Sequence, residues 1–229
     1  FKVCTLRHIP IFTFVNKMDR EARDPFELME NIEEILGIKT YPMNWPISCG
    51  KDFKGVYDRS AKRVLAFSSD GRANGVKMVD EVEAELGDAA LDTLIGTVNH
   101  EKLAEDIELL DGAAEEFDLE AVQHGELSPV FFGSALTNFG VEPFLKEFLR
   151  LTPAPLPRKD AASGELVDPC SEQFSGFVFK IQANMNKNHR DRIAFLRICS
   201  GKFERGMEAF HVQEGKNIKL ATGTQLMAQ

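Results

Sequence analysis

A continuous apolar segment that runs straight into a polar loop constrains this chain most. Residues 9–15 read Ile-Pro-Ile-Phe-Thr-Phe-Val, without any alternation of polar and apolar side chains. Such a run is typical of a strand buried on both faces, as in the parallel sheets of α/β proteins. The tetrapeptide Asn-Lys-Met-Asp at residues 16–19 follows at once. Because ligands of open α/β sheets bind at the carboxyl ends of strands, the sequence predicts an α/β domain with binding residues in this loop.

The segment after this loop predicts an amphipathic helix over residues 25–36. Asp24 is a favourable N-cap, Pro25 suits the first helical position, and Gly37 is a typical terminator. Apolar residues recur at helical spacing and predict a buried stripe. Its members are Phe26, Leu28, Met29, Ile32, Ile35 and Leu36.

A second short buried strand is predicted at Val-Phe-Phe, residues 130–132, and a Gly-Ser-Ala tripeptide follows it directly. A helix predicted over residues 139–151 comes next and is ended by Pro153. Both polar loops therefore leave the carboxyl ends of buried strands. The residues of this helix predicted to face inward are Phe144, Leu145, Phe148 and Leu149.

Outside these segments the spacing of apolar residues changes. Residues 41–69 predict short strands around a polar turn at residues 58–62, and residues 79–124 predict two or three acidic amphipathic helices. Residues 152–172 carry four prolines among polar residues and predict a linker. Alternating apolar residues after the linker, separated by glycine turns, predict antiparallel strands, which we interpret as a barrel.

The first loop has the residue types that a guanine base requires. Guanine presents two neighbouring donors, N1–H and the N2 amino group, and the Asp19 carboxylate can accept both. Adenine lacks these donors and would leave a buried carboxylate unsatisfied, which is the strong form of selectivity. Lys17 can lay its aliphatic stem along the base, and Asn16 would tie the loop to its neighbours. This is the N-K-x-D pattern of GTPases.

The second loop strengthens this hypothesis. A Gly-Ser-Ala loop in GTPases presents a backbone N–H to guanine O6, which falls here on Ala135, and Ser134 would brace Asp19. The candidate guanine-binding residues are therefore Asn16, Lys17, Asp19, Ser134 and Ala135.

The phosphate-binding half of such a site has no counterpart in the sequence. No G-x-x-x-x-G-K-[ST] loop occurs, and no aspartate at a strand end is recognisable as a Mg²⁺ ligand. The chain begins with Phe1, and we interpret it as a piece of a longer protein. No catalytic or metal-binding residue is assigned, and the chain alone is expected to hydrolyse no GTP.

Longer motifs resemble one family. The 113 residues between Asp19 and Gly133 far exceed the single helix that a minimal GTPase domain needs there. A large insertion between the two base loops resembles translational GTPases of the elongation factor G and release factor type. More specifically, several segments resemble the family of peptide chain release factor three. These are residues 16–27 (NKMDREARDPFE), 45–51 (WPISCGK), 53–57 (FKGVY), 132–136 (FGSAL), 174–185 (FSGFVFKIQANM) and 189–192 (HRDR).

The resemblance implies an α/β fold made of the C-terminal part of a GTPase domain, a large α+β insertion and an all-β translation-factor barrel. The GTPase parts are residues 1–40 and 128–152, and the inserted subdomain is residues 41–127. The linker is residues 153–172, and an incomplete barrel spans residues 173–229.

The resemblance also implies a ribosome-dependent GTPase that promotes release and recycling of class I release factors. The expected ligand is GTP or GDP, with Mg²⁺ only in the full-length protein. The expected partners are the ribosome and class I release factors.

Two further groups of residues have alternative interpretations. Lys187, Arg190 and Arg192 form a basic loop that is either a solvated turn or a contact with RNA phosphate. Trp45 is interpreted as a core residue and not as a stacking platform.

Charge, hydropathy and cysteine usage limit the possible partners and the redox environment of the protein. The net charge is −9, and residues 78–126 hold 16 acidic residues and one lysine. This segment is either a solvated face or a docking surface for a basic partner. No apolar run reaches the roughly 18 residues that span a bilayer, so a membrane is not an expected partner. DNA is not an expected partner either. Four scattered cysteines suit a reducing cytoplasm.

Two alternatives stay open. The chain could belong to another insert-bearing translational GTPase, such as elongation factor G. It could also be a ribosome-binding or protein-docking module without nucleotide chemistry. A phosphate loop upstream of Phe1 would favour a GTPase over such a module.

Overall fold

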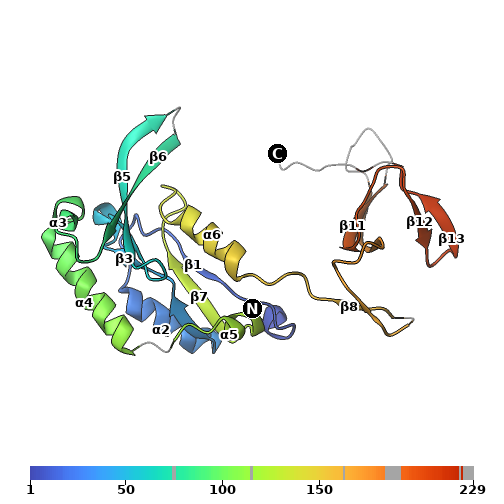
Figure 1. Ribbon diagram of the computed structural model, residues 1–229, viewed down its shortest axis with the longest axis horizontal. Helices are drawn as coiled ribbons and strands as arrows, with labels where there is room; N and C mark the ends of the chain where they lie inside the picture. Colours follow the sequence, from blue (N-terminus) through green and yellow to red (C-terminus); the bar gives the residue numbers. More distant parts are fainter. Residues whose placement is uncertain (74–75, 114–115, 162, 184–191, 222, 224–229) are drawn as a thin grey trace. The chain divides into compact units, whose positions relative to one another are not determined.

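The computed structural model describes residues 1–229 apart from 74–75, 114–115, 162, 184–191, 222 and 224–229, and describes only the backbone of residues 67–73, 76–81 and 113. The chain forms two compact units, Phe1–Thr152 and Pro153–Gln229 (Figure 1). In the described part of the chain, no helix is long and apolar enough to cross a membrane.

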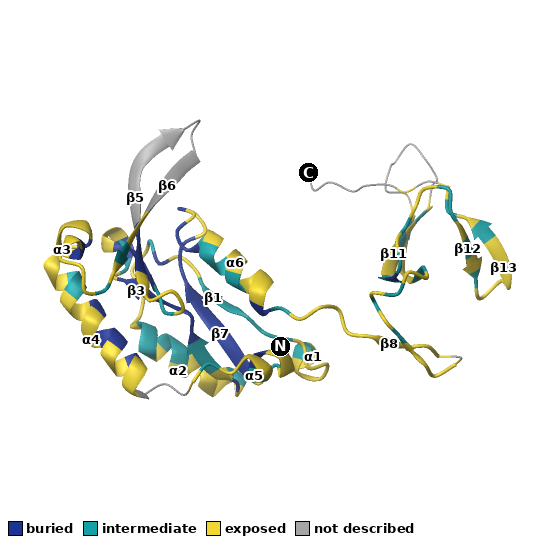
Figure 2. Ribbon diagram, in the orientation of Figure 1, coloured by how far each residue is buried: buried dark blue, intermediate teal, exposed yellow. Residues whose placement is uncertain are grey.

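A three-stranded parallel sheet lies at the centre of the first unit, in the order β1 (Thr13–Val15), β7 (Leu127–Phe132) and β2 (Lys39–Pro42). Every residue of β7 is buried, which confirms the predicted buried strand (Figure 2). The prediction for residues 9–15 was wrong in two respects, because only Thr13–Val15 is a strand and it is half-buried. Among the described strands β1 pairs only with β7, so its other edge lacks a neighbour.

Helix α2 (Pro25–Leu36) forms as its capping residues predict. The Asp24 carboxylate accepts a hydrogen bond from the Phe26 N–H at 2.8 Å, and Gly37 adopts the left-handed conformation that ends the helix. Local signals in the sequence were therefore sufficient to place α2. The first unit also contains a short helix, α1 (Lys2–Thr5).

Helix α6 (Val141–Leu151) covers the sheet along a narrower stripe than the sequence predicted. Phe144 packs against Phe14 and Phe131, and Leu151 is fully buried. These two residues are seven positions apart and share one helix face. Leu145 and Leu149, which were predicted to face inward, are exposed, and the exposed fraction of Phe148 is 37%.

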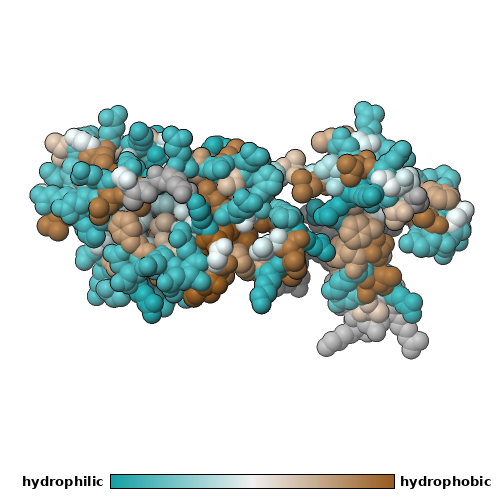
Figure 3. Space-filling model, turned by 90° about the horizontal axis from the view of Figure 1, so that it is seen from below, coloured by the Kyte–Doolittle hydropathy of each residue, from teal (hydrophilic) through white to brown (hydrophobic). Residues whose placement is uncertain are grey.

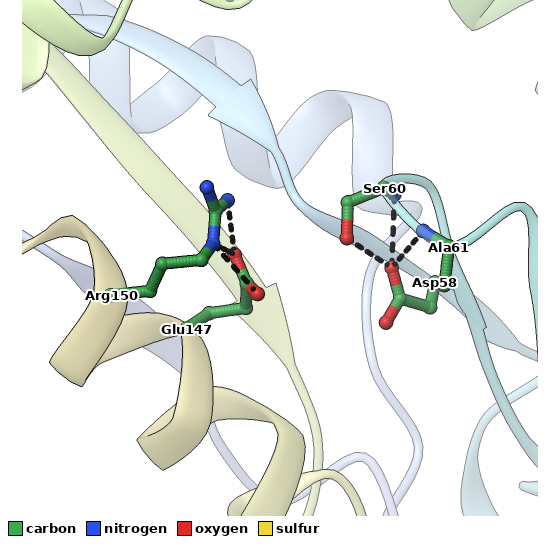
Figure 4. Close-up of polar contacts among 5 residues, drawn as sticks. All are labelled: Asp58, Ser60, Ala61, Glu147 and Arg150. Atoms are coloured by element: carbon green, nitrogen blue, oxygen red, sulfur yellow. Dashed lines mark hydrogen bonds and ion pairs between the residues drawn. The ribbon is translucent and has the colours of Figure 1, made fainter.

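An antiparallel sheet separates the strands of the central sheet in the sequence. It comprises β3 (Asn44–Ile47), β4 (Gly55–Asp58), β5 (Arg63–Ala73) and β6 (Val76–Glu85), with a 3₁₀ turn η1 (Gly50–Asp52) after β3. The predicted turn at residues 58–62 is present, and the Asp58 carboxylate accepts hydrogen bonds from Ser60 and Ala61 there (Figure 4).

Acidic helices follow this sheet, but they begin later than predicted. Residues 79–85 belong to β6 and pair with β5, so the helical prediction for them was wrong. Acidic and apolar residues alternate over residues 81–85 (Glu-Val-Glu-Ala-Glu), which is the period of a strand. The helices are α3 (Ala90–Leu94), α4 (Thr97–Ala113) and α5 (Leu119–His124).

Trp45 joins the two sheets and the acidic helix α4. Its side chain is fully buried, with ring centroids 4.5 Å from Phe26 and 5.6 Å from Phe132. Its Nε1–H donates to the buried Asp106 carboxylate at 3.0 Å, and Lys102 pairs with the same carboxylate. Trp45 is thus a core residue, as predicted, and part of the acidic segment faces inward.

His100 ties the start of α4 to α3 and to the loop after β6. Its Nδ1 lies 2.9 Å from Asp92 Oδ1 and its Nε2 lies 2.7 Å from the Leu86 carbonyl oxygen. The hydrogen bond to Asp92, and secondarily that to Leu86, raise the pKa of His100 above its ordinary value of 6.5. Only the imidazolium can donate from both nitrogens.

We therefore expect the stability of this region to fall with increasing pH. Because the folded-state pKa is raised, the contribution of His100 is fully present below about pH 6.5 and is lost as pH rises through the folded value. Urea unfolding at pH 6 and pH 8 should show this loss. Asp92→Asn, which removes the main cause of the raised pKa, should reduce the pH dependence, and an unchanged dependence would contradict the assignment.

The described strands of the second unit form three separate antiparallel pairs. These are β8 (Arg158–Lys159) with β9 (Leu166–Val167), β10 (Ser175–Ala183) with β11 (Arg192–Ser200), and β12 (Glu208–His211) with β13 (Lys216–Lys219). The predicted linker thus contains a short hairpin. Apolar side chains reach the surface of this unit (Figure 3), among them those of Phe177, Phe179, Ile181 and Phe210. A closed barrel stays a prediction.

Candidate nucleotide-binding site

The two central strands bring the predicted loops together. Val15 is in register with Phe132 in the parallel pair of β1 and β7, so both loops leave the sheet at one level. Backbone hydrogen bonds then continue between them. The Gly133 N–H donates to the Val15 carbonyl at 3.0 Å, and the Met18 N–H donates to the Gly133 carbonyl at 3.1 Å. The loops are therefore joined along their first residues.

Gly133 is required for this close approach. A Cβ atom added to it would lie 2.5 Å from the Phe139 carbonyl oxygen and 2.8 Å from the Phe14 ring. Only a residue without a side chain fits between β1 and the turn before α6.

Residues of the first loop differ sharply in exposure. The exposed fraction of Met18 is 1%, and its side chain belongs to the main core cluster. Asn16 and Lys17 are exposed, and Asp19 is half-buried. Lys17 has a φ of 71°, in the left-handed region that a non-glycine residue seldom adopts. The buried Met18 therefore anchors a loop whose polar residues remain available to a ligand.

Ser134 connects the second loop to the carboxylate of the first. Its hydroxyl donates to Asp19 Oδ1 at 2.5 Å, and the Ser134 side chain is fully buried. Two backbone hydrogen bonds between Ser134 and Phe139 hold the serine in turn. The carboxylate is thus oriented by a rigid neighbour while it keeps further acceptor capacity.

Asn16 makes a second connection, which differs in part from the prediction. Its Oδ1 accepts the N–H of Lys17 at 2.8 Å and the N–H of Ala135 at 2.9 Å. Asn16 thus ties the two loops together as expected. However, the Ala135 N–H that was predicted to meet guanine O6 already has a partner. To bind O6, this N–H must be shared with Asn16 or turn away from it.

Two residues that support these loops were missed by sequence reasoning. The Asn44 side chain pairs with both backbone groups of Phe132, and the Gly50 N–H donates to carbonyls of the first loop. Neither lies near the loops in sequence. A polar residue beside Trp45 in an otherwise apolar strand was the available signal for Asn44.

The three residues predicted as possible RNA contacts lie in the second unit. Arg192 is exposed and begins β11, whereas Lys187 and Arg190 lie outside the described residues. All four cysteines are free thiols. Among the residues that the structure describes, no group of three or more His, Cys, Asp or Glu side chains could hold a metal ion.

Comparison with known proteins assigns both units. A family model described as "Elongation factor Tu GTP binding domain" matches residues 1–154, and one described as "Elongation factor G domain 2" matches residues 173–229. The chain is 54% identical to peptide chain release factor 3 of Symbiobacterium thermophilum and 49% identical to that of Ligilactobacillus salivarius. Both alignments cover 100% of this chain and 43% of the relative, so the chain spans less than half of either protein.

Proposed function

The chain belongs to the family of the elongation factor Tu GTP-binding domain, and from that premise we propose that its two joined loops form the guanine end of the nucleotide site. The observation that carries the proposal is the hydrogen bond from Ser134 to Asp19. It links residues from both loops and orients a half-buried carboxylate at the carboxyl edge of the sheet. The proposed binding residues are Asn16, Lys17, Asp19, Ser134 and Ala135.

Each residue has a distinct role in this proposal. Asp19 accepts N1–H and the N2 amino group of guanine, and Ser134 fixes the carboxylate in place. Lys17 covers one face of the base with its aliphatic stem. Asn16 keeps the loops together, and the Ala135 N–H serves O6. Adenine would leave the carboxylate without donors, and burying an unpaired charged group is costly.

The five proposed binding residues account for the base and not for the phosphates of the nucleotide. A guanine nucleotide is the ligand of this family, and Mg²⁺ would accompany its phosphates. We found no acidic or histidine cluster suited to a metal ion in the described ranges. We propose that other segments of the full-length protein hold the phosphates and Mg²⁺.

For the full-length protein we propose a role in translation termination. The relatives are named peptide chain release factor 3, and a barrel of the elongation factor G type would follow the GTPase domain. The protein would act on the ribosome in the cytoplasm and promote release and recycling of class I release factors. The GTPase domain would comprise residues 1–40 and 128–152, with an insertion at residues 41–127 and a barrel at residues 173–229. Arg192, with Lys187 and Arg190, would contact ribosomal RNA.

Removing the Ser134 hydroxyl tests the guanine site directly. In the full-length protein, Ser134→Ala should weaken binding of guanosine diphosphate by roughly 1–2 kcal/mol, because the Asp19 carboxylate loses its orienting donor. Competition binding with guanosine and adenosine diphosphates measures both affinity and base preference.

Ser128→Ala is the matched control for this experiment. Ser128 lies in β7, the strand that leads to the Ser134 loop, and is as fully buried as Ser134. Its hydroxyl pairs with Thr13 at 2.8 Å, away from the loops. It should leave the base preference unchanged. Equal effects of the two substitutions would count against the proposed pocket.

A further inference from the structure

We propose that Asn44 and Gly50 are positioning residues that set the distance between the two base-binding loops. They lie at the two ends of a segment, residues 44–50, that comprises β3 and the start of η1. Asn44 holds the strand that carries the Gly-Ser-Ala loop, and Gly50 holds the Asn-Lys-Met-Asp loop. The proposal rests on the proposed guanine site. It assigns part of the base specificity to the antiparallel sheet.

Asn44 completes β7 where its strand partner ends. The pairing of β2 with β7 ends at Pro42 and Val130, and Met43 adds one more hydrogen bond to the Val130 carbonyl. Beyond this point the Asn44 amide replaces the missing strand. Its Oδ1 accepts the Phe132 N–H at 2.7 Å, and its Nδ2 donates to the Phe132 carbonyl at 3.1 Å.

This contact controls the residue directly before the second loop. Asn44 is 4% exposed, so both backbone groups of Phe132 are paired away from water. Buried backbone groups that lose their partners cost more than an exposed hydrogen bond contributes. Without Asn44, the end of β7 would have to move toward other partners, and Gly133 and Ser134 would move with it.

Gly50 acts on the other loop from the opposite end of the segment. Its N–H donates to the Met18 carbonyl at 2.8 Å and to the Arg20 carbonyl at 3.1 Å. These two carbonyls flank Asp19, so one donor fixes the backbone on both sides of the carboxylate. Gly50 has a φ of +67°, and an added Cβ would lie 2.8 Å from Glu21 Oε1.

The segment between these two contacts is well suited to transmit a fixed distance. All four residues of β3 are buried, and they pair with β4 in an antiparallel ladder. Trp45 packs on the Phe132 ring, so β3 is fixed to β7 through a side chain as well as through Asn44. A base that is held between Asp19 and Ala135 requires a fixed distance between the two loops.

The experiment compares two nucleotides that differ only in one of the two donors that Asp19 is proposed to accept. Inosine diphosphate lacks the N2 amino group of guanosine diphosphate and keeps O6. The dissociation constant of inosine diphosphate divided by that of guanosine diphosphate therefore reports the alignment of Asp19. This ratio does not change when a fraction of the protein is merely unfolded. In the full-length protein, Asn44→Ala should lower this ratio by roughly fivefold, the size of one weakened hydrogen bond. Gly50→Ala keeps the donating N–H, but its Cβ meets Glu21 and strains a left-handed backbone position, so the displaced N–H should lower the ratio by a similar factor.

Two control variants separate positioning from general damage. Gly37→Ala introduces the same backbone strain, since Gly37 has a φ of +65°, but nothing lies within 4 Å of the added Cβ. Val56→Ala creates a cavity at a fully buried position of β4. Both should leave the ratio at the value of the unsubstituted protein. If Asn44→Ala does not fold, Asn44→Ser, which keeps one hydrogen-bonding group, replaces it and should lower the ratio less.

The outcomes distinguish this proposal from the proposed function. If the unsubstituted protein prefers guanosine diphosphate and a variant at Asn44 or Gly50 retains that full preference, the assignment of that residue is overturned. A ratio that falls equally in the control variants would also overturn it. If the unsubstituted protein shows no preference for guanosine diphosphate, the guanine site itself is wrong.

Discussion

Replacing Asp19 with asparagine is expected to move the base preference of the full-length protein from guanine to xanthine. Xanthine carries a carbonyl where guanine has its N2 amino group. In the variant, the Ser134 hydroxyl should still donate to Oδ1, as it does to the carboxylate at 2.5 Å, and this contact fixes which way the amide points. The amide nitrogen then faces position 2 of the base and donates to the xanthine carbonyl.

The expected change is roughly 1–3 kcal/mol in each direction, weaker for guanosine and stronger for xanthosine diphosphate. Competition binding with both nucleotides measures it. Asp24→Asn is the control, because it makes the same substitution at an aspartate outside the loop. Asp24 caps α2, and asparagine is an equally good N-cap. This control should leave both affinities unchanged. If Asp19→Asn keeps the guanine preference, Asp19 does not read the base.

Replacing Trp45 with alanine is expected to have the largest effect on stability. The fully buried indole contacts α2 and β7 through aromatic rings and α4 through Asp106. Its loss should lower the stability of this region by about 3–5 kcal/mol, the usual cost of truncating a buried Trp. The Asp106 carboxylate would also lose a donor in a buried position, which adds to the cost.

Amide hydrogen exchange in α2, β7 and α4 measures this effect element by element, because the protection of each amide reports the free energy of local opening. Trp45→Phe keeps an aromatic ring and removes only the N–H, so it should cost less than Trp45→Ala. Leu149→Ala changes a residue that is 76% exposed and should change protection little. Unchanged protection of α4 in Trp45→Ala would show that the indole does not join these elements.

Local signals in the sequence were sufficient wherever the determining contacts lie within a few residues. Asp24, Pro25 and Gly37 specified α2 because a cap satisfies backbone groups of its own helix. The turn at residues 58–62 formed for the same reason, with the Asp58 side chain bonded to its near neighbours. The two loop motifs were recognisable because base recognition requires particular residue types in short runs.

Periodicity alone did not decide which faces are buried. Residues 79–85 were predicted to be helical but belong to β6, and the register of residues 82–85 with Arg63–Ala66 of β5 fixes them as a strand. Leu145 and Leu149 have the spacing of an inward stripe on α6, yet the sheet meets that helix at Phe144 and Leu151. An apolar pattern gives the candidates, and the partner surface selects among them.

By itself, the sequence determined the type of domain and the residues of the candidate base site. Only the tertiary structure decided how that site is held together. The hydrogen bond from Ser134 to Asp19 joins residues 115 positions apart, and the pairing of Asn44 with Phe132 joins residues 88 apart. Such contacts leave little trace in local pattern, because they depend on which strands lie side by side after folding. The hydroxyl of Ser134, the amide of Asn44 and the N–H of Gly50 reach their hydrogen-bond partners only when β1, β3 and β7 converge.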